Sequence, residues 1–240
     1  MNMMDLNQLL RENEYPGRGI VLGRTSDGRY GAIAYFIMGR SVNSRNRVFV
    51  SQSDGGIITK AFDESKMVDP SLIIYAPVRV PAKGCWIVTN GDQTDTIRDF
   101  LAQGKTFEEA LRTRTFEPDP PNFTPRISGL MTAGAGALSY RLSILKSDNG
   151  REDSVQRFFY EYAQPRAGEG HFIHTYRCNG NPIPSFEGEP EWVAIGDDFD
   201  SFTRGVWENL NPENKVSLFT AFVDLADGKA VRSAILNKNV

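Results

Sequence analysis

Cysteine and histidine are scarce in this chain of 240 residues, which contains two of each. Cys85 and Cys178 are far apart in the sequence and form no C-x-x-C pair, so no disulfide-rich scaffold is predicted. A single disulfide between them is the alternative to two free thiols, which are favoured. His171 and His174 lie three residues apart on a predicted strand, which points them to opposite faces and makes them a poor metal pair. No metal and no other cofactor are therefore expected.

Long apolar runs are also missing. The run at 32–38 ends at Gly39 and Arg40, too short to cross a bilayer, and residues 1–11 lack the apolar core of a signal peptide, so a cytoplasmic protein is expected. The net charge of −3 gives no overall reason to expect nucleic-acid or membrane partners. A hydrophobic content of 40% is enough for one sizeable core.

Turn residues between apolar segments predict a chain built mostly of antiparallel strands. Asp27-Gly28 and Asp227-Gly228 are typical hairpin turns. The predicted strands are 19–24 with 29–38, 72–80 with 85–90, 127–133 with 137–146, 156–162, 171–176, and 215–225 with 229–236. Helices are expected at 94–103, at 106–113 after a capping box, and at 198–210. Residues 117–125 hold four prolines and are expected to form an extended loop. This pattern favours an α+β fold.

Acidic residues are absent between Gly28 and Ser53, and arginines gather there. The loop at 39–47 follows an apolar strand and offers guanidinium, hydroxyl and amide donors without a carboxylate, which favours binding of an anion such as a phosphate. The alternative is a solvated turn whose arginines pair with the acidic stretch 187–200. The loop is not a P-loop, because G-x-x-x-x-G-K-[ST] is absent. A mononucleotide fits better than a nucleic acid, since no long basic stripe exists.

Several motifs resemble the archaeal-type IMP cyclohydrolases. They are YPGRG at 15–19, YFIMGRS at 35–41 with NSRNR at 43–47, NGDQT at 90–94, NFTPRI at 122–127, and HTY at 174–176 followed by PSF at 184–186. The arginine-loop motif is the most specific of them. The resemblance runs from about residue 15 to the end and suggests an extension at 1–14 and one domain at 15–240.

The resemblance implies a four-layer αββα sandwich like that of N-terminal nucleophile hydrolases, without their self-processing. It implies closure of 5-formamidoimidazole-4-carboxamide ribotide to IMP and water, the last step of purine synthesis. The partners would be this nucleotide substrate and product; the oligomeric state is left open. The substrate-binding candidates are Arg18, Arg40, Ser41, Asn43, Ser44, Arg45, Asn46, Arg47, Asn90, Gly91, Asp92 and Arg126.

Ring closure needs a group that removes a proton and donors that stabilise a developing oxygen anion. Tyr75, Glu117 and, at lower rank, Lys83 are the catalytic candidates. Each has an ordinary structural alternative: a packed strand tyrosine, an exposed loop carboxylate and a solvated turn lysine. Residues 90–94 join a strand to a helix. Their backbone N–H groups could bind an anion, and the alternative is that Asp92 or Thr94 caps the helix. Arg126 either binds substrate or forms an ion pair.

Two other functions remain open at this point. A nucleotide-binding or regulatory protein of the same fold would keep the arginine loop and lose the acid–base groups. An amidohydrolase of the N-terminal nucleophile class would need a processed Thr, Ser or Cys at its terminus. The longer N-terminus speaks against that second class.

Overall fold

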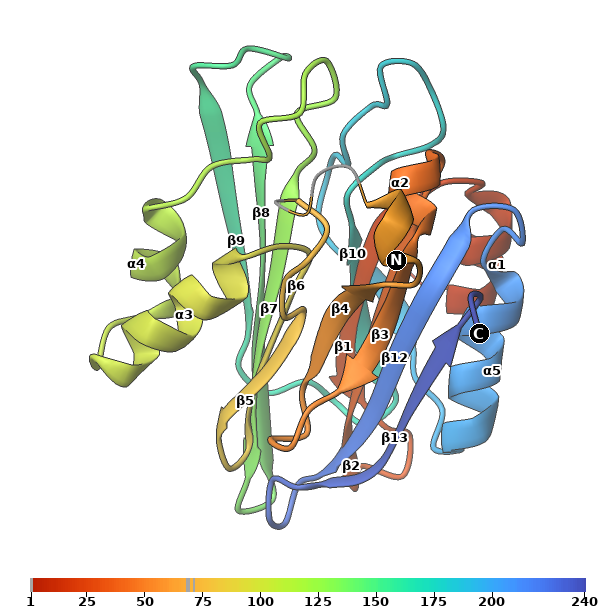
Figure 1. Ribbon diagram of the computed structural model, residues 1–240. Coiled ribbons are helices and arrows are strands. Elements are labelled where there is room, and N and C mark those ends of the chain that lie inside the picture. Colours follow the sequence, from red (N-terminus) through yellow and green to blue (C-terminus); the bar gives the residue numbers. More distant parts are fainter. Residues whose placement is uncertain (1, 68–69, 71) are drawn as a thin grey trace.

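The computed structural model describes residues 2–67, 70 and 72–240. Two antiparallel sheets form its centre (Figure 1). The six-stranded sheet has the order β11-β10-β1-β2-β12-β13 and the seven-stranded sheet the order β3-β4-β5-β6-β7-β8-β9. The strands of the first sheet are β1 (Arg18–Arg24), β2 (Tyr30–Met38), β10 (Glu169–His174), β11 (Glu191–Ala194), β12 (Lys215–Asp224) and β13 (Ala230–Asn237). Those of the second are β3 (Arg47–Ser51), β4 (Ile57–Ala61), β5 (Val78–Ala82), β6 (Cys85–Thr89), β7 (Arg126–Gly134), β8 (Ala137–Ser147) and β9 (Val155–Tyr162).

Helices cover the outer face of each sheet, so the layers follow the order α, β, β, α (Figure 1). Helices α1 (Leu6–Glu12) and α5 (Phe199–Asn209) cover the six-stranded sheet, and α3 (Gln93–Ala102) and α4 (Phe107–Arg112) cover the seven-stranded sheet. The short α2 (Val42–Arg45) joins β2 to β3, and the 3-10 turn η1 (Glu64–Lys66) follows β4. No helix of the described residues is long and apolar enough to cross a membrane.

Three apolar clusters hold these layers together. The largest lies between the sheets and includes Ile20, Trp86 and Ile127. A second joins α1 and α5 to the six-stranded sheet, and a third joins α3 and α4 to the seven-stranded sheet. Burial of apolar side chains on both faces of each sheet therefore accounts for the sandwich.

Most elements agree with the sequence pattern. The Asp27-Gly28 and Asp227-Gly228 turns connect β1 to β2 and β12 to β13, with both glycines at positive φ. The predicted capping box at the start of α4 is present, with Thr106 and Glu109 bonding each other's backbone N–H groups. The pattern missed α1, α2, β3, β4 and β11, which are short or lack a clear period.

The predicted strand at 72–80 was wrong over its first part, because β5 begins only at Val78. Tyr75 therefore lies in an irregular segment that the structure describes from Leu72 to Pro77. Backbone and side chain of Thr59 on β4 take over its hydrogen bonds: Thr59 N–H donates to the Tyr75 carbonyl, and Tyr75 N–H donates to Thr59 Oγ1 at 2.8 Å. Proline breaks the strand ladder here, and a side chain replaces it.

Candidate active site

Three strands from both sheets begin with an arginine at the same end of the sandwich (Figure 1). Arg18 starts β1, Arg47 starts β3 and Arg126 starts β7. All three are buried; Arg47 is 0% exposed and Arg18 is 8% exposed. Glu117, from the proline-rich loop before β7, is 2% exposed among them. Four charged side chains buried together are costly to fold and are typical of functional sites.

The guanidinium groups of Arg18 and Arg47 keep donors that are not satisfied. Arg47 donates from Nε to the Ser44 carbonyl at 2.8 Å, but its Nη1 is buried and bonds to no described residue. Nε of Arg18 is likewise buried and unbonded within the described part of the chain. A buried donor without an acceptor costs free energy, so both groups are well placed to receive an oxygen of a bound molecule.

The backbone before Arg18 requires a glycine. Gly17 has φ +80°, and a Cβ there would lie 2.3 Å from Thr175 Oγ1. The same Thr175 oxygen accepts from Arg18 N–H at 3.1 Å, while Thr175 N–H donates to the Arg18 carbonyl. Close packing of Gly17 on Thr175 therefore fixes the start of β1 and with it the position of Arg18.

Glu117 has an altered acidity. Burial raises the pKa of its carboxyl group from 4.5 to about 7, although Arg18 and Arg126 act in the opposite direction. Arg18 and Glu117 attract each other without an ion pair within 4.0 Å in the described structure. A carboxylate that titrates near neutral pH is suited to accept and return a proton.

We expect Glu117→Gln to stabilise the protein at alkaline pH. The folded-state pKa is raised, so the contribution of Glu117 to stability is fully present below pH 4.5, is lost as pH rises to about 7, and stays absent above it. Glutamine removes this loss, which amounts to at most about 3 kcal/mol. Thermal melts of both proteins at pH 4.5 and pH 8.5 should show the variant gaining relative stability only at the higher pH. A constant difference would contradict the ionisation of a buried Glu117.

Tyr75 belongs to the same cluster. Its hydroxyl lies 2.8 Å from that of Tyr35 on β2, and the Tyr75 side chain is 8% exposed. Tyr35 is completely buried and stacks on Phe49. Burial raises the pKa of Tyr35 well above 10, so this hydroxyl stays protonated. The Tyr35 hydroxyl thus holds the Tyr75 hydroxyl in place by a hydrogen bond, and Tyr75 is the more exposed of the two.

The arginine loop divides into a buried and an exposed part. Arg40 and Arg45 are exposed, and each bonds to neutral oxygens: Arg40 to Asn179 Oδ1 at 2.6 Å and the Gly180 carbonyl, Arg45 to the Gly39 carbonyl and Asn214. Among the described residues no carboxylate pairs with either arginine, nor with Arg47. The described structure thus holds no ion pair between these arginines and the acidic stretch.

The other polar residues of the loop maintain its shape. Ser41 caps α2 through the Ser44 N–H, and Ser44 Oγ accepts from Ser41 N–H at 3.0 Å. Asn46 is buried and bonds the backbone of Asp63 in both directions. Asn43 Oδ1 is buried and has no hydrogen-bond partner among the described residues. All four were predicted from the sequence to bind substrate. In the structure, Ser41, Ser44 and Asn46 form hydrogen bonds within the protein instead.

The turn at 90–94 holds Arg126 in place. Asn90 is fully buried; it donates to the Pro125 carbonyl and accepts from Ile127 N–H. Arg126 Nη1 lies 2.8 Å from Asp92 Oδ1, so the ion pair anticipated for Arg126 is present, and Asp92 makes no side-chain cap to α3. A Cβ at Gly91 would lie 2.3 Å from Arg126 Nη1, which explains the glycine.

One predicted catalytic residue, Lys83, and the two histidines lie elsewhere. Lys83 is exposed in the turn between β5 and β6, at the opposite end of β6 from Asn90, so the structure does not bring it to the buried cluster. His171 bonds Tyr140 at 2.7 Å, while His174 bonds the Tyr176 carbonyl at 2.8 Å. No group of three or more His, Cys, Asp or Glu residues in the described chain is arranged to hold a metal ion.

Comparison with known proteins assigns the chain to a family. The sequence model of the IMP cyclohydrolase-like proteins matches residues 15–229. The chain belongs to this family. An IMP cyclohydrolase of Methanopyrus kandleri is 29% identical over 166 residues, 68% of this chain and 75% of the relative. One of Methanosphaera stadtmanae is 29% identical over 202 residues, 80% of this chain and 91% of the relative.

Sequence reasoning missed two tyrosines that lie at this buried cluster. Tyr35 was hidden inside an apolar strand, although it stands at the head of the YFIMGRS motif. Tyr176 accompanies Arg18 and bonds Thr124 at 2.6 Å through its hydroxyl. Both tyrosines lie in motifs that the family resemblance had already marked, so motif membership was the available indication.

Proposed function

We propose that this protein is an IMP cyclohydrolase that closes the purine ring of 5-formamidoimidazole-4-carboxamide ribotide, releasing IMP and water. Membership of the family over residues 15–229 supports the reaction, and the buried cluster of Arg18, Arg47, Glu117 and Tyr75 supports its location. The observation that carries the proposal is a carboxyl group with a pKa of about 7 beside two unsatisfied guanidinium donors.

The substrate supplies part of the catalysis. Its carboxamide and formamido groups sit on adjacent ring atoms, so attack of the amide nitrogen on the formyl carbon is intramolecular. In the proposal the Glu117 carboxylate takes the proton that leaves the amide nitrogen. Arg18, Arg47 and the Tyr75 hydroxyl donate to the formyl oxygen as it becomes negative. Glu117 returns this proton to the oxygen, which becomes a hydroxyl group. The hydroxyl then leaves as water with the proton of the former formamido nitrogen, and the C=N bond that completes the purine ring forms.

The exposed part of the loop is suited to the phosphate. Arg40 and Arg45 are bonded only to neutral oxygens, which a phosphate can displace at little electrostatic cost. Arg47 continues from this loop into the buried cluster. The proposal therefore puts the ribose phosphate at the surface and the imidazole end against Glu117. Asn90, Gly91 and Asp92 act through Arg126 rather than as direct ligands.

Replacing Arg40 or Arg45 with alanine is expected to weaken IMP binding about ten-fold each, because a charge-assisted contact is worth roughly 1.5–3 kcal/mol. The phosphate does not change during ring closure, so KM should rise while kcat is largely kept. Arg232→Ala is the matched control, since Arg232 is also exposed but pairs with Asp200. Calorimetric titration with IMP measures the affinity of all three variants. Normal affinity in both loop variants would contradict the proposal that this loop binds the phosphate.

The finer features of the fold and setting belong to the same proposal. The layer order α, β, β, α supports a sandwich of the type found in N-terminal nucleophile hydrolases. Residues 15–240 form the catalytic domain in this view, and 1–14 are an extension before the family match. A cytoplasmic enzyme acting on a free nucleotide accords with the net charge of −3.

The direct test is to mix the purified protein with the formamido ribotide and follow the absorbance of IMP. Steady formation of IMP, faster than in buffer and proportional to protein, is expected. Tight binding of IMP without turnover would instead identify a nucleotide-binding protein of the same family. Activity that survives exhaustive EDTA treatment is expected as well, since Glu117, Tyr75 and the arginines supply the chemistry.

A further inference from the structure

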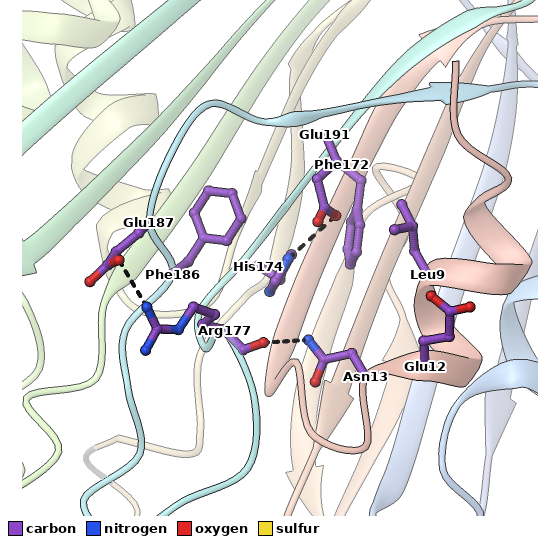
Figure 2. Close-up of a pocket in the computed structure, with 9 residues that line it drawn as sticks. All are labelled: Leu9, Glu12, Asn13, Phe172, His174, Arg177, Phe186, Glu187 and Glu191. Atoms are coloured by element: carbon purple, nitrogen blue, oxygen red, sulfur yellow. Dashed lines mark hydrogen bonds and ion pairs between the residues drawn. The ribbon is translucent and has the colours of Figure 1, made fainter. Parts of the chain in front are cut away.

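A cavity of about 230 Å³ lies on the helix-covered side of the six-stranded sheet, away from the arginine cluster (Figure 2). Its walls come from β10, β11, α1 and the segment after β10. Side chains alternate between the two faces of a strand, and Ile173 packs between the sheets together with its partner Ile20. The next residue, His174, therefore points to the helix-covered side. Leu9 comes from α1, which precedes the family match at residue 15. The cavity is thus partly built from the chain's own extension.

The hydrogen bonding of His174 determines what its free nitrogen offers. Nδ1 lies 2.8 Å from the Tyr176 carbonyl oxygen, and a carbonyl only accepts, so Nδ1 carries the hydrogen. In the neutral ring, Nε2 is then an acceptor. It faces Glu191 Oε2 at 3.4 Å (Figure 2).

Glu191 adds a second acceptor to the same place. Its Oε2 is buried and receives no hydrogen bond from any described residue. The side chain of His174 is 4% exposed and that of Glu191 is 26% exposed, so the pair is open to solvent only on the side of Glu191. Two buried acceptors side by side call for a donor with positive charge.

The surroundings favour a flat organic cation. Phe172 stacks on His174 with ring centroids 4.7 Å apart, and Phe186 meets it edge-on at 4.5 Å. Both phenyl groups line the cavity. The remaining charged lining residues are Glu12, and Arg177 paired with Glu187 at 3.0 Å. The three carboxylates of the lining outnumber its cationic groups in either charge state of His174, so the lining carries net negative charge, and aromatic faces attract cations.

We propose that this cavity binds a small planar cation of the amidinium or guanidinium class, with its N–H groups donating to Glu191 and His174. The site is separate from the arginine cluster: His174 faces the helices, while Thr175, the next residue, bonds Arg18 on β1. The proposal rests on the cavity alone and does not depend on the proposed cyclohydrolase activity.

Benzamidine is a suitable probe, and benzamide is its neutral match in shape. Calorimetric titration of the full chain at pH 8 should show binding of benzamidine and at least ten-fold weaker binding of benzamide. Glu191→Gln should lose about ten-fold or more in benzamidine affinity, because the charge is removed and the new amide N–H donates to His174 Nε2. Glu189→Gln is the matched control, since Glu189 is exposed and does not line this cavity; the affinity of this variant should stay within two-fold.

Three results would overturn the proposal. They are equal binding of benzamide and benzamidine, unchanged affinity in a folded Glu191→Gln variant, and displacement of benzamidine by IMP. The last result would mean that the probe occupies the nucleotide site instead. Circular dichroism of each variant establishes that it is folded before it is titrated.

Discussion

Replacing Glu117 with glutamine is expected to lower kcat by about 10²–10⁴-fold while IMP still binds with nearly normal affinity. The substitution keeps the shape of the side chain and removes only its ability to take a proton. The amide proton leaves during ring closure, so the loss should appear in kcat and not in KM. Because the substrate already holds its reacting groups together, the effect is expected toward the lower end of this range.

The pH dependence provides the internal control for this variant. Glu117 must be ionised to act as a base, so wild-type kcat/KM should rise about ten-fold per pH unit below pH 7 and level off above it. The Glu117→Gln protein should lose this step. A wild-type profile that is flat from pH 5.5 to pH 8.5 would contradict the assignment of Glu117 as the base.

Tyr75→Phe is expected to reduce kcat by about 10²-fold or more with little change in IMP affinity. The hydroxyl would donate to the formyl oxygen only as charge develops there, so its loss weakens the transition state rather than the ground state. Steady-state kinetics with the formamido ribotide measure both parameters.

Tyr35→Phe is the control for Tyr75, because it removes the other hydroxyl of the 2.8 Å pair from a completely buried position. It should lower kcat by less than about ten-fold, through looser placement of Tyr75. If Tyr75→Phe cyclises the substrate at the wild-type rate, the tyrosine pair is structural. Arg126, held by Asp92 beside Glu117, is then the next donor to replace.

Local sequence signals predicted the elements that local chemistry controls. The Asp-Gly turns and the Thr106–Glu109 capping box depend on a few adjacent residues, and the structure contains them. The strand expected at 72–80 depended on the apolar run alone. There Thr59, a residue from another strand, provides the hydrogen bonds that Tyr75 makes, and this contact has no trace in the local pattern.

The candidate site shows the same limit. An acid-free run around Arg40, Arg45 and Arg47 was visible in the sequence, but its division into exposed and buried arginines was not. Arg47 is buried because it begins a strand that packs into the sandwich, whereas Arg40 and Arg45, which precede it in the chain, are exposed. Glu117 looked like a loop carboxylate, and only its burial in the folded protein, which outweighs the opposing charges of Arg18 and Arg126, raises its pKa to about 7.

The most direct test of the account is a crystal structure of the protein with IMP. The account predicts the purine ring within hydrogen-bond distance of Glu117 and Tyr75, a water molecule on Arg18 and Arg47 at the place that the formyl oxygen leaves, and the phosphate on Arg40 and Arg45. IMP bound only in the cavity of Figure 2, or with its phosphate inside the buried cluster and its base in solvent, would contradict it.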